Sequence, residues 1–284
     1  MTKLILLVDG SAYGESVCDH AAWVAATMGA EIELLHVLGR RDTQSLPTNL
    51  SGSLGFGAKH DLLDKLAAHD EERAKLVKER GRAILDAAAS YLTDKGVSEI
   101  SLRLRHGDLV EALQQVEGEA DLILIGKRGE AADFAAEHLG SNLERIVRAA
   151  HKPVMVASRK FSPVTRALIA FDGGASARKA VSHIAGGQLF KGIPLHLLTV
   201  GKDDASRVDA LEAAAEDLRA AGHTVTTAIR AGDPDKVIVD YVEDEAISLL
   251  VMGAYGHSRM RNLVIGSTTT DMIRNCHVPV MLFR

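Results

Sequence analysis

The chain has 284 residues, of which 46% are hydrophobic and 25% are charged. This is the composition of a globular protein, so wholesale disorder is excluded, and the length predicts about two domains. The formal net charge is −5. We therefore expect no nucleic-acid partner, because proteins that bind the phosphate backbone are usually basic.

Cysteine usage and the N-terminus bear on the cellular compartment. The two cysteines, Cys18 and Cys276, lie far apart in the chain, which excludes a disulfide-rich secreted fold and favours a reducing compartment. The apolar run from Leu4 to Val8 is too short for the core of a signal peptide, and no apolar stretch is long enough to span a membrane. We expect a soluble, cytoplasmic protein with no membrane partner.

The first part of the chain alternates short apolar runs with amphipathic segments. This pattern is typical of buried parallel strands joined by helices. It predicts strands over residues 3–8, 31–37, 100–105, 121–126 and 153–157, and helices over 14–28, 60–93, 108–117 and 141–150.

An insertion over residues 39–93 interrupts this alternation. Residues 39–58 are rich in glycine and serine, as loops are, and residues 60–93 form one helical pattern in which charges alternate with Leu66, Val77 and Ile84. Two interpretations stay open. The helix is a solvated surface helix with a long lead-in, or it is a lid or partner-binding arm.

The polar stretch from Ser158 to Thr165 separates this part from a second one with the same pattern. Strands are predicted there over 166–171, 194–200, 223–230, 248–252 and 278–283, and helices over 175–190, 205–221, 234–245 and 267–276. Right-handed crossovers then give two tandem α/β domains, residues 1–160 and 161–284. Each is an open, doubly wound, Rossmann-like parallel sheet of five strands.

The two parts are copies of one another. Asp9 aligns with Asp172 at the end of the first strand, and Gly126 aligns with Gly253 at the end of the fourth. In open parallel sheets ligands bind beyond the carboxyl ends of the strands. The candidate site therefore lies where Asp172 and Gly253 end their strands.

A glycine motif follows the fourth strand of the second copy. Gly253 and Gly256 allow the backbone to approach a ligand closely. After nine intervening residues, Gly266 precedes Ser267, Thr268 and Thr269 at the start of a helix. Free backbone N–H groups and the helix dipole favour an anion there, Arg259 adds positive charge, and Asp172 is suited to ribose hydroxyls or an adenine amine. The motif predicts a nucleoside polyphosphate site. The alternative is that the glycines serve only turns and Ser267 only caps the helix.

The tandem copies and this motif resemble the universal stress protein family in its two-domain form. The resemblance implies ATP, carried with Mg²⁺, as the ligand. It assigns Gly253, Gly256, Gly266, Ser267 and Thr268 to the phosphates and ribose, and Phe171, Asp172, Val200 and Met252 to the adenine and ribose pocket. It also implies that residues 153–157 and 279–283 pair antiparallel, which makes a pseudo-dimer within one chain. A further homodimer stays open.

The first copy departs from the motif. Ten residues rather than nine separate Gly129 from Gly140, and the loop between them carries more carboxylates than its counterpart. Because carboxylates repel a triphosphate, we expect the second copy to bind ATP and the first to bind it weakly or not at all.

The sequence lacks the signature motifs of several other classes of protein. The sequence has no GxxxxGK[ST] run, no GxGxxG after the first strand and no HxxxH or HExxH spacing, so we predict no metal site. No nucleophile–base–orienter set emerges, and we assign no catalytic residue. We predict an ATP-binding, stress-response regulatory protein with little or no turnover. A ligand-free dimerising scaffold and a weak ATP hydrolase are the alternatives.

Overall fold

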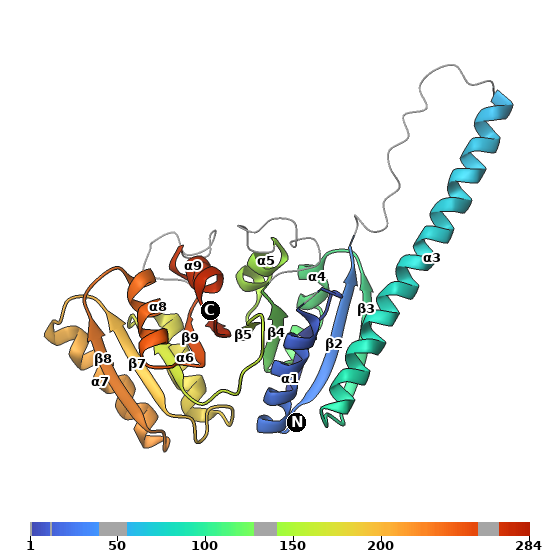
Figure 1. Ribbon diagram of the computed structural model, residues 1–284. Helices are drawn as coiled ribbons and strands as arrows, with labels where there is room; N and C mark the ends of the chain where they lie inside the picture. The colour runs from blue at the N-terminus through green and yellow to red at the C-terminus, as the bar shows by residue number, and fades with distance from the viewer. Residues whose placement is uncertain (1, 12, 40–55, 128–140, 255–266) are drawn as a thin grey trace.

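One sheet runs through both copies (Figure 1). The computed structural model describes residues 2–11, 13–39, 56–127, 141–254 and 267–284. Over these residues ten strands form a single sheet in the order β3-β2-β1-β4-β5-β10-β9-β6-β7-β8. The α/β fold with a mostly parallel sheet is confirmed.

The first copy supplies one half of this sheet. Its elements are β1 (Lys3–Leu7), α1 (Gly14–Met28), β2 (Glu31–Leu38), α3 (Phe56–Asp94), β3 (Ile100–His106), α4 (Leu109–Gln114), a 3₁₀ turn η1 (Glu117–Glu119), β4 (Leu122–Gly126), α5 (Ser141–Ala149) and β5 (Val154–Ala157). The helix expected over 108–117 ends at Gln114 and gives way to the 3₁₀ turn.

The second copy supplies the other half with the same order of elements. These are β6 (Ala167–Ala170), α6 (Ala175–Gly186), β7 (Leu195–Val200), α7 (Ala205–Ala220), β8 (Val225–Arg230), α8 (Pro234–Asp244), β9 (Leu249–Gly253), α9 (Ser267–Asn275) and β10 (Val280–Phe283). The helix expected over 175–190 ends at Gly186, where two successive glycines weaken the helix.

The last strands of the two copies join the halves of the sheet. β5 and β10 pair antiparallel, with Met155 opposite Met281, whereas every other pair of neighbouring strands is parallel. This confirms the expected pairing of residues 153–157 with 279–283. The domain limits 1–160 and 161–284 stay a prediction.

Helices cover both faces of the sheet. One apolar layer contains buried residues of α1, α3, α6 and α7, such as Val17, Leu85, Ala177 and Leu211. The opposite layer contains buried residues of α4, α5, α8 and α9. Each layer extends across both copies, so the hydrophobic core follows the continuous sheet.

Helix α3 packs on the sheet only in its C-terminal part. Gly81 is buried there, and an added Cβ would lie 2.9 Å from methyl groups of Leu38 and Leu104. A larger residue at position 81 would require these leucine side chains to shift, so the glycine favours the close approach of the helix to β2 and β3. The N-terminal part of the helix projects beyond the sheet (Figure 1).

Candidate functional site

The candidate site is the carboxyl edge of strands β6, β7 and β9. Ala170, the last residue of β6, pairs with Leu198 of β7 on one side and with Met252 of β9 on the other. The residues that follow these positions therefore reach the same edge of the sheet. Phe171, Asp172, Val200, Met252 and Gly253 are brought together in this way.

Asp172 heads a tight turn at this edge. The backbone N–H of Gly174 donates to Asp172 Oδ1 at 2.8 Å, and Gly173 adopts a φ of +75°, which favours glycine. The Asp172 side chain is exposed to solvent. The turn thus holds a carboxylate at the end of β6, where a ligand above the sheet would meet it.

The floor of the site is apolar and closely packed. Phe171 and Met252 are each only 5% exposed and belong to the two opposite layers of the core, while Val200 and Gly253 are half-buried. The hydroxyl of Thr199 donates to the carbonyl oxygen of Phe171 at 2.8 Å. Sequence reasoning missed Thr199, whose only signal is a hydroxyl within an otherwise apolar strand.

Helix α9 is attached to the end of β9 by a buried side chain. Thr269 is 2% exposed, and its hydroxyl lies 3.3 Å from the carbonyl oxygens of both Gly253 and Ala254. Because a hydroxyl has one proton, it shares that proton between the two carbonyls. Thr269 therefore positions the helix, and its predicted contact with the nucleotide stays a prediction. Thr268, beside it, is half-buried.

Part of the predicted motif lies outside the described residues. This applies to Gly256, Arg259 and Gly266, and to the side chain of Ser267, which begins α9. Their predicted contacts with phosphate stay predictions.

The first copy repeats the turn at Asp9 but packs differently around it. The N–H of Ser11 donates to Asp9 Oδ1 at 3.0 Å, and Gly10 has a φ of +74°. An added Cβ at Gly10 would lie 2.9 Å from Ile84 Cδ1 of α3, whereas one at Gly173 meets no described atom within 4 Å. Helix α3 therefore covers the first turn, whereas among the described residues nothing covers Gly173 of the second turn in the same way.

Two side chains that fix the second site are replaced in the first. His36 occupies the place of Thr199 and donates from Nδ1 to the carbonyl oxygen of Val8 at 2.7 Å. Leu143, buried in the apolar layer, stands where Thr269 stands in the second copy. The helix of the first copy is thus held there by apolar packing.

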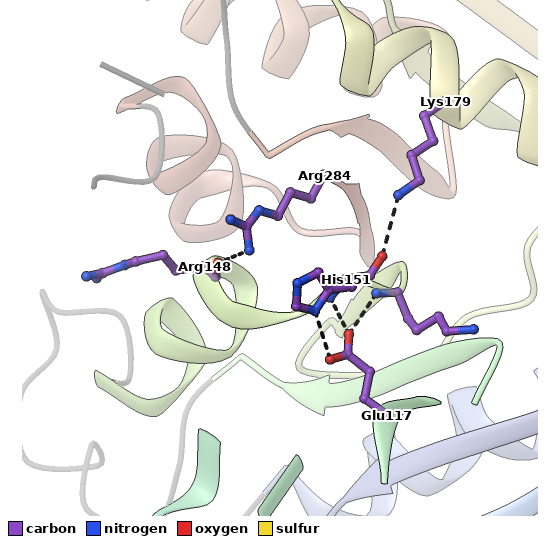
Figure 2. A network of polar contacts seen from close by, with 6 residues as sticks. Glu117, Arg148, His151, Lys179 and Arg284 are labelled. Atoms are coloured by element: carbon purple, nitrogen blue, oxygen red, sulfur yellow. Dashed lines mark hydrogen bonds and ion pairs between the residues drawn. The ribbon is translucent and has the colours of Figure 1, made fainter. Parts of the chain in front are cut away.

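Basic side chains cross between the copies (Figure 2). Lys127 Nζ donates to the carbonyl oxygen of Cys276, just beyond α9, at 3.0 Å, and Arg284 Nη1 donates to that of Arg148, in the last turn of α5, at 2.7 Å. Lys179 Nζ lies 3.5 Å from the carbonyl oxygen of His151. Cations at helix C-termini complement the helix dipole, so each copy stabilises the end of the other's helix.

A buried carboxylate orders the turn before β5. Glu117 is 5% exposed and accepts hydrogen bonds from the backbone N–H groups of His151 and Lys152 (Figure 2), the second at 2.8 Å. This turn carries the His151 carbonyl that faces Lys179.

Two histidines at equivalent helix positions and both cysteines are packed rather than exposed. His20 and His183 lie edge-on to Phe161 and Phe283, with ring centroids 4.9 and 5.1 Å apart. Burial lowers the pKa of both imidazoles and raises the pKa of the Cys18 thiol to about 12. Such a thiol stays protonated and unreactive at neutral pH.

The described part of the chain contains no cluster of three or more His, Cys, Asp or Glu suited to a metal ion. Among its helices, none is both long and apolar enough to cross a membrane.

Comparison with known proteins decides the family. A sequence model described as the universal stress protein family matches residues 1–158 and 201–284. The chain belongs to this family. The two matched segments fit two tandem copies of the fold.

Three known proteins align with nearly the whole of this chain. Universal stress protein Slr1230 from Synechocystis sp. is 39% identical over 287 residues, which cover 100% of both chains. A universal stress protein structure from Archaeoglobus fulgidus DSM 4304 aligns with a TM-score of 0.73 at 23% identity, covering 99% of this chain and 98% of the other. A further structure, from Pseudomonas aeruginosa UCBPP-PA14, has a TM-score of 0.63 at 16% identity, covering 100% and 93%. At these identities the two structures support the shared fold alone.

Proposed function

We propose that the second copy binds an adenine nucleotide, ATP with Mg²⁺, and that the protein acts as a nucleotide-dependent regulator with little or no turnover. The observation that carries this proposal is the meeting of Asp172, Val200 and Gly253 at one sheet edge, with helix α9 attached to the same edge by Thr269. A carboxylate suits ribose hydroxyls or the adenine amine, and a helix N-terminus suits phosphate.

Two contrasts between the copies support the second one as the binding site. The turn after β6 is open at Gly173, whereas the turn after β1 has Ile84 of α3 against Gly10. The glycine motif has its nine-residue spacing in the second copy only, with Arg259 in the loop, while the first copy has Glu130, Asp133 and Glu137. Repulsion by these carboxylates would weaken triphosphate binding.

Magnesium would be bound at this site mainly by the phosphates of the nucleotide. Mg²⁺ in nucleotide sites keeps several waters and takes few protein ligands. The absence of a metal-binding cluster among the described residues agrees with an ion delivered by the nucleotide.

The first experiment is to identify the small molecules released when the purified protein is denatured. We expect one adenine nucleotide per chain, lost in Gly266→Glu and retained in the matched control Gly140→Glu. Added Mg-ATP should raise the melting temperature of ligand-free protein, because a ligand at about 100 times its Kd stabilises by about 2.7 kcal/mol.

Each other outcome has a definite meaning. Two nucleotides per chain would contradict the restriction to the second copy. No nucleotide and no thermal shift would contradict binding and favour the dimerising scaffold. Phosphate release from ATP well above background, abolished by Asp172→Ala, would replace the regulator with a weak hydrolase.

A further inference from the structure

Helix α3 carries a projecting segment, residues 65–80, which we name the arm. None of its residues is buried, and Leu76 is 59% exposed, whereas Gly81, next along the helix, packs against the sheet. At 1.5 Å per residue the arm extends about 24 Å beyond this contact. It is plainly separate from the body of the molecule (Figure 1). Most of the stability of a helix in a protein comes from tertiary packing of its amphipathic face.

The side chains of the arm follow the seven-residue repeat of a coiled coil. Leu66, Asp70, Arg73 and Val77 are spaced by four, three and four residues, so they lie along one stripe of the helix. Small or apolar residues flank this stripe, namely Ala67 and Ala74 on one side and Leu76 on the other. Arg80 continues the stripe three residues beyond Val77, and the other charged residues lie away from it: Lys65, Glu71, Glu72, Lys75, Lys78 and Glu79. A stripe of this kind is suited to a second helix.

The stripe is complementary to itself when two arms run antiparallel. Positions 66 and 77, and positions 70 and 73, are symmetric about the same midpoint. Leu66 of one arm would then lie against Val77 of the other, and Asp70 against Arg73, in both directions. A parallel pairing would instead bring Asp70 against Asp70, and like charges repel. The order of charges therefore selects the antiparallel arrangement.

The fold sets a limit that agrees with this pairing. About the same midpoint, Gly81 of one chain lies level with position 62 of the other. From residue 65 onward, Gly81 is the first residue of α3 that is buried, and it lies against Leu38 and Leu104 of the sheet. The overlap thus ends where the body of the molecule begins.

We propose that the arm is a self-association surface, through which two copies of this chain pair their α3 helices antiparallel with Asp70 of each against Arg73 of the other. This proposal does not depend on nucleotide binding. It selects the partner-binding interpretation of the insertion and names a second copy of the chain as the partner.

Charge reversal at the stripe tests the pairing. We expect the wild-type chain to sediment as a dimer in analytical ultracentrifugation at micromolar concentration. Asp70→Arg and Arg73→Asp, made separately, each place like charges against one another. Each should raise the dimer dissociation constant about tenfold or more. Both positions are exposed, so folding should be preserved, as checked by circular dichroism.

Two combinations identify the partner residues. A mixture of the Asp70→Arg chain with the Arg73→Asp chain puts opposite charges together at both contacts, so it should form a heterodimer. The double variant, with both changes in one chain, should form a homodimer again. Lys75→Glu reverses a charge on the opposite face of the arm and should leave the dimer unchanged.

Three results would overturn the proposal. A monomeric wild-type chain would show that the arm does not self-associate. Single variants that dimerise like the wild type would assign the dimer to another surface. Single variants that dissociate but are not rescued by mixing would refute the pairing of position 70 with position 73.

Discussion

At the scale of single residues, two histidines occupy equivalent helix positions, where His20 is fully buried and His183 is half-buried. Burial is the largest influence on His20 and His183, and it lowers the pKa of each imidazole below the usual 6.5 because it penalises the charged form. Around His20 the Ser16 carbonyl and the Asp19 carboxylate act in the opposite direction, but they do not offset the burial. Around His183 the distant Asp121 carboxylate acts likewise.

These shifts predict that acid destabilises the protein. As pH falls below 6.5, the unfolded chain binds protons at both histidines and the folded chain resists them. The stability present above this pH is therefore lost as pH falls through the folded-state pKa values. We expect a lower melting temperature at about pH 5 than at about pH 7. NMR titration of the two imidazoles should give pKa values below 6.5. An imidazole that titrates at or above 6.5 would contradict the prediction for that residue.

Paired carboxylates change the stability of the protein at lower pH than the two histidines do, so the two effects can be distinguished. The Arg145 guanidinium lowers the pKa of Asp108, and the Thr227 hydroxyl together with Arg219 lowers that of Glu212. Their contribution to stability is lost only when the pH falls below the ordinary carboxylate range.

The sequence does not show the neighbours of these histidines. His20 contacts Phe161 and Ser158, which lie in the link between the copies. Contacts between residues so far apart in the chain follow from the tertiary fold, and neither periodicity nor spacing encodes them.

At the scale of elements, the Thr269 hydroxyl joins α9 to β9 and sets the place of the helix N-terminus. Thr269→Val keeps the shape of the side chain and removes the hydrogen bond to the carbonyls of Gly253 and Ala254. We expect a loss of about 0.5–1.5 kcal/mol in the free energy of unfolding, measured with urea. If the predicted nucleotide binds there, its affinity should fall as well.

The control for this variant is Thr269→Ser, which keeps the hydroxyl. It should retain more of both stability and affinity than Thr269→Val. If serine costs as much as valine, the methyl group rather than the hydroxyl holds the helix.

Sequence patterns predicted the elements well where the physical signal is local. Strands are short apolar runs, and most of the expected boundaries lie within two residues of those observed. The site is partly predictable for the same reason, since Asp172 and Gly253 directly end strands. The hydroxyls of Thr199 and Thr269 donate to carbonyl oxygens of other segments, and a local pattern does not show such contacts. The sequence therefore provided no reason to choose Thr199, and it pointed to Thr269 only as part of the glycine motif. The contact of Ile84 with Gly10 depends on how α3 crosses the sheet, which no local pattern shows.

At the scale of the whole molecule, the two copies share one sheet and both layers of its core. Met155 and Met281 are fully buried and face one another across the antiparallel junction of β5 and β10. The apolar layer that contains them also contains residues of α1 in the first copy and of α7 in the second. A packing defect at the junction should therefore lower the stability of both copies.

This organisation predicts that the two copies unfold together. Met281→Ala removes a buried side chain at the junction and should cost about 2–5 kcal/mol. Trp23, the single tryptophan, lies in α1 of the first copy, so its fluorescence reports on the copy that is not mutated. In a denaturant titration the midpoint followed by Trp23 should shift as far as the midpoint followed by far-UV circular dichroism.

The control is Val208→Ala, on the exposed side of α7, which should change stability by less than about 0.5 kcal/mol. If the Trp23 midpoint stays in place while an earlier transition develops in the circular dichroism, the copies unfold as separate domains despite their common sheet.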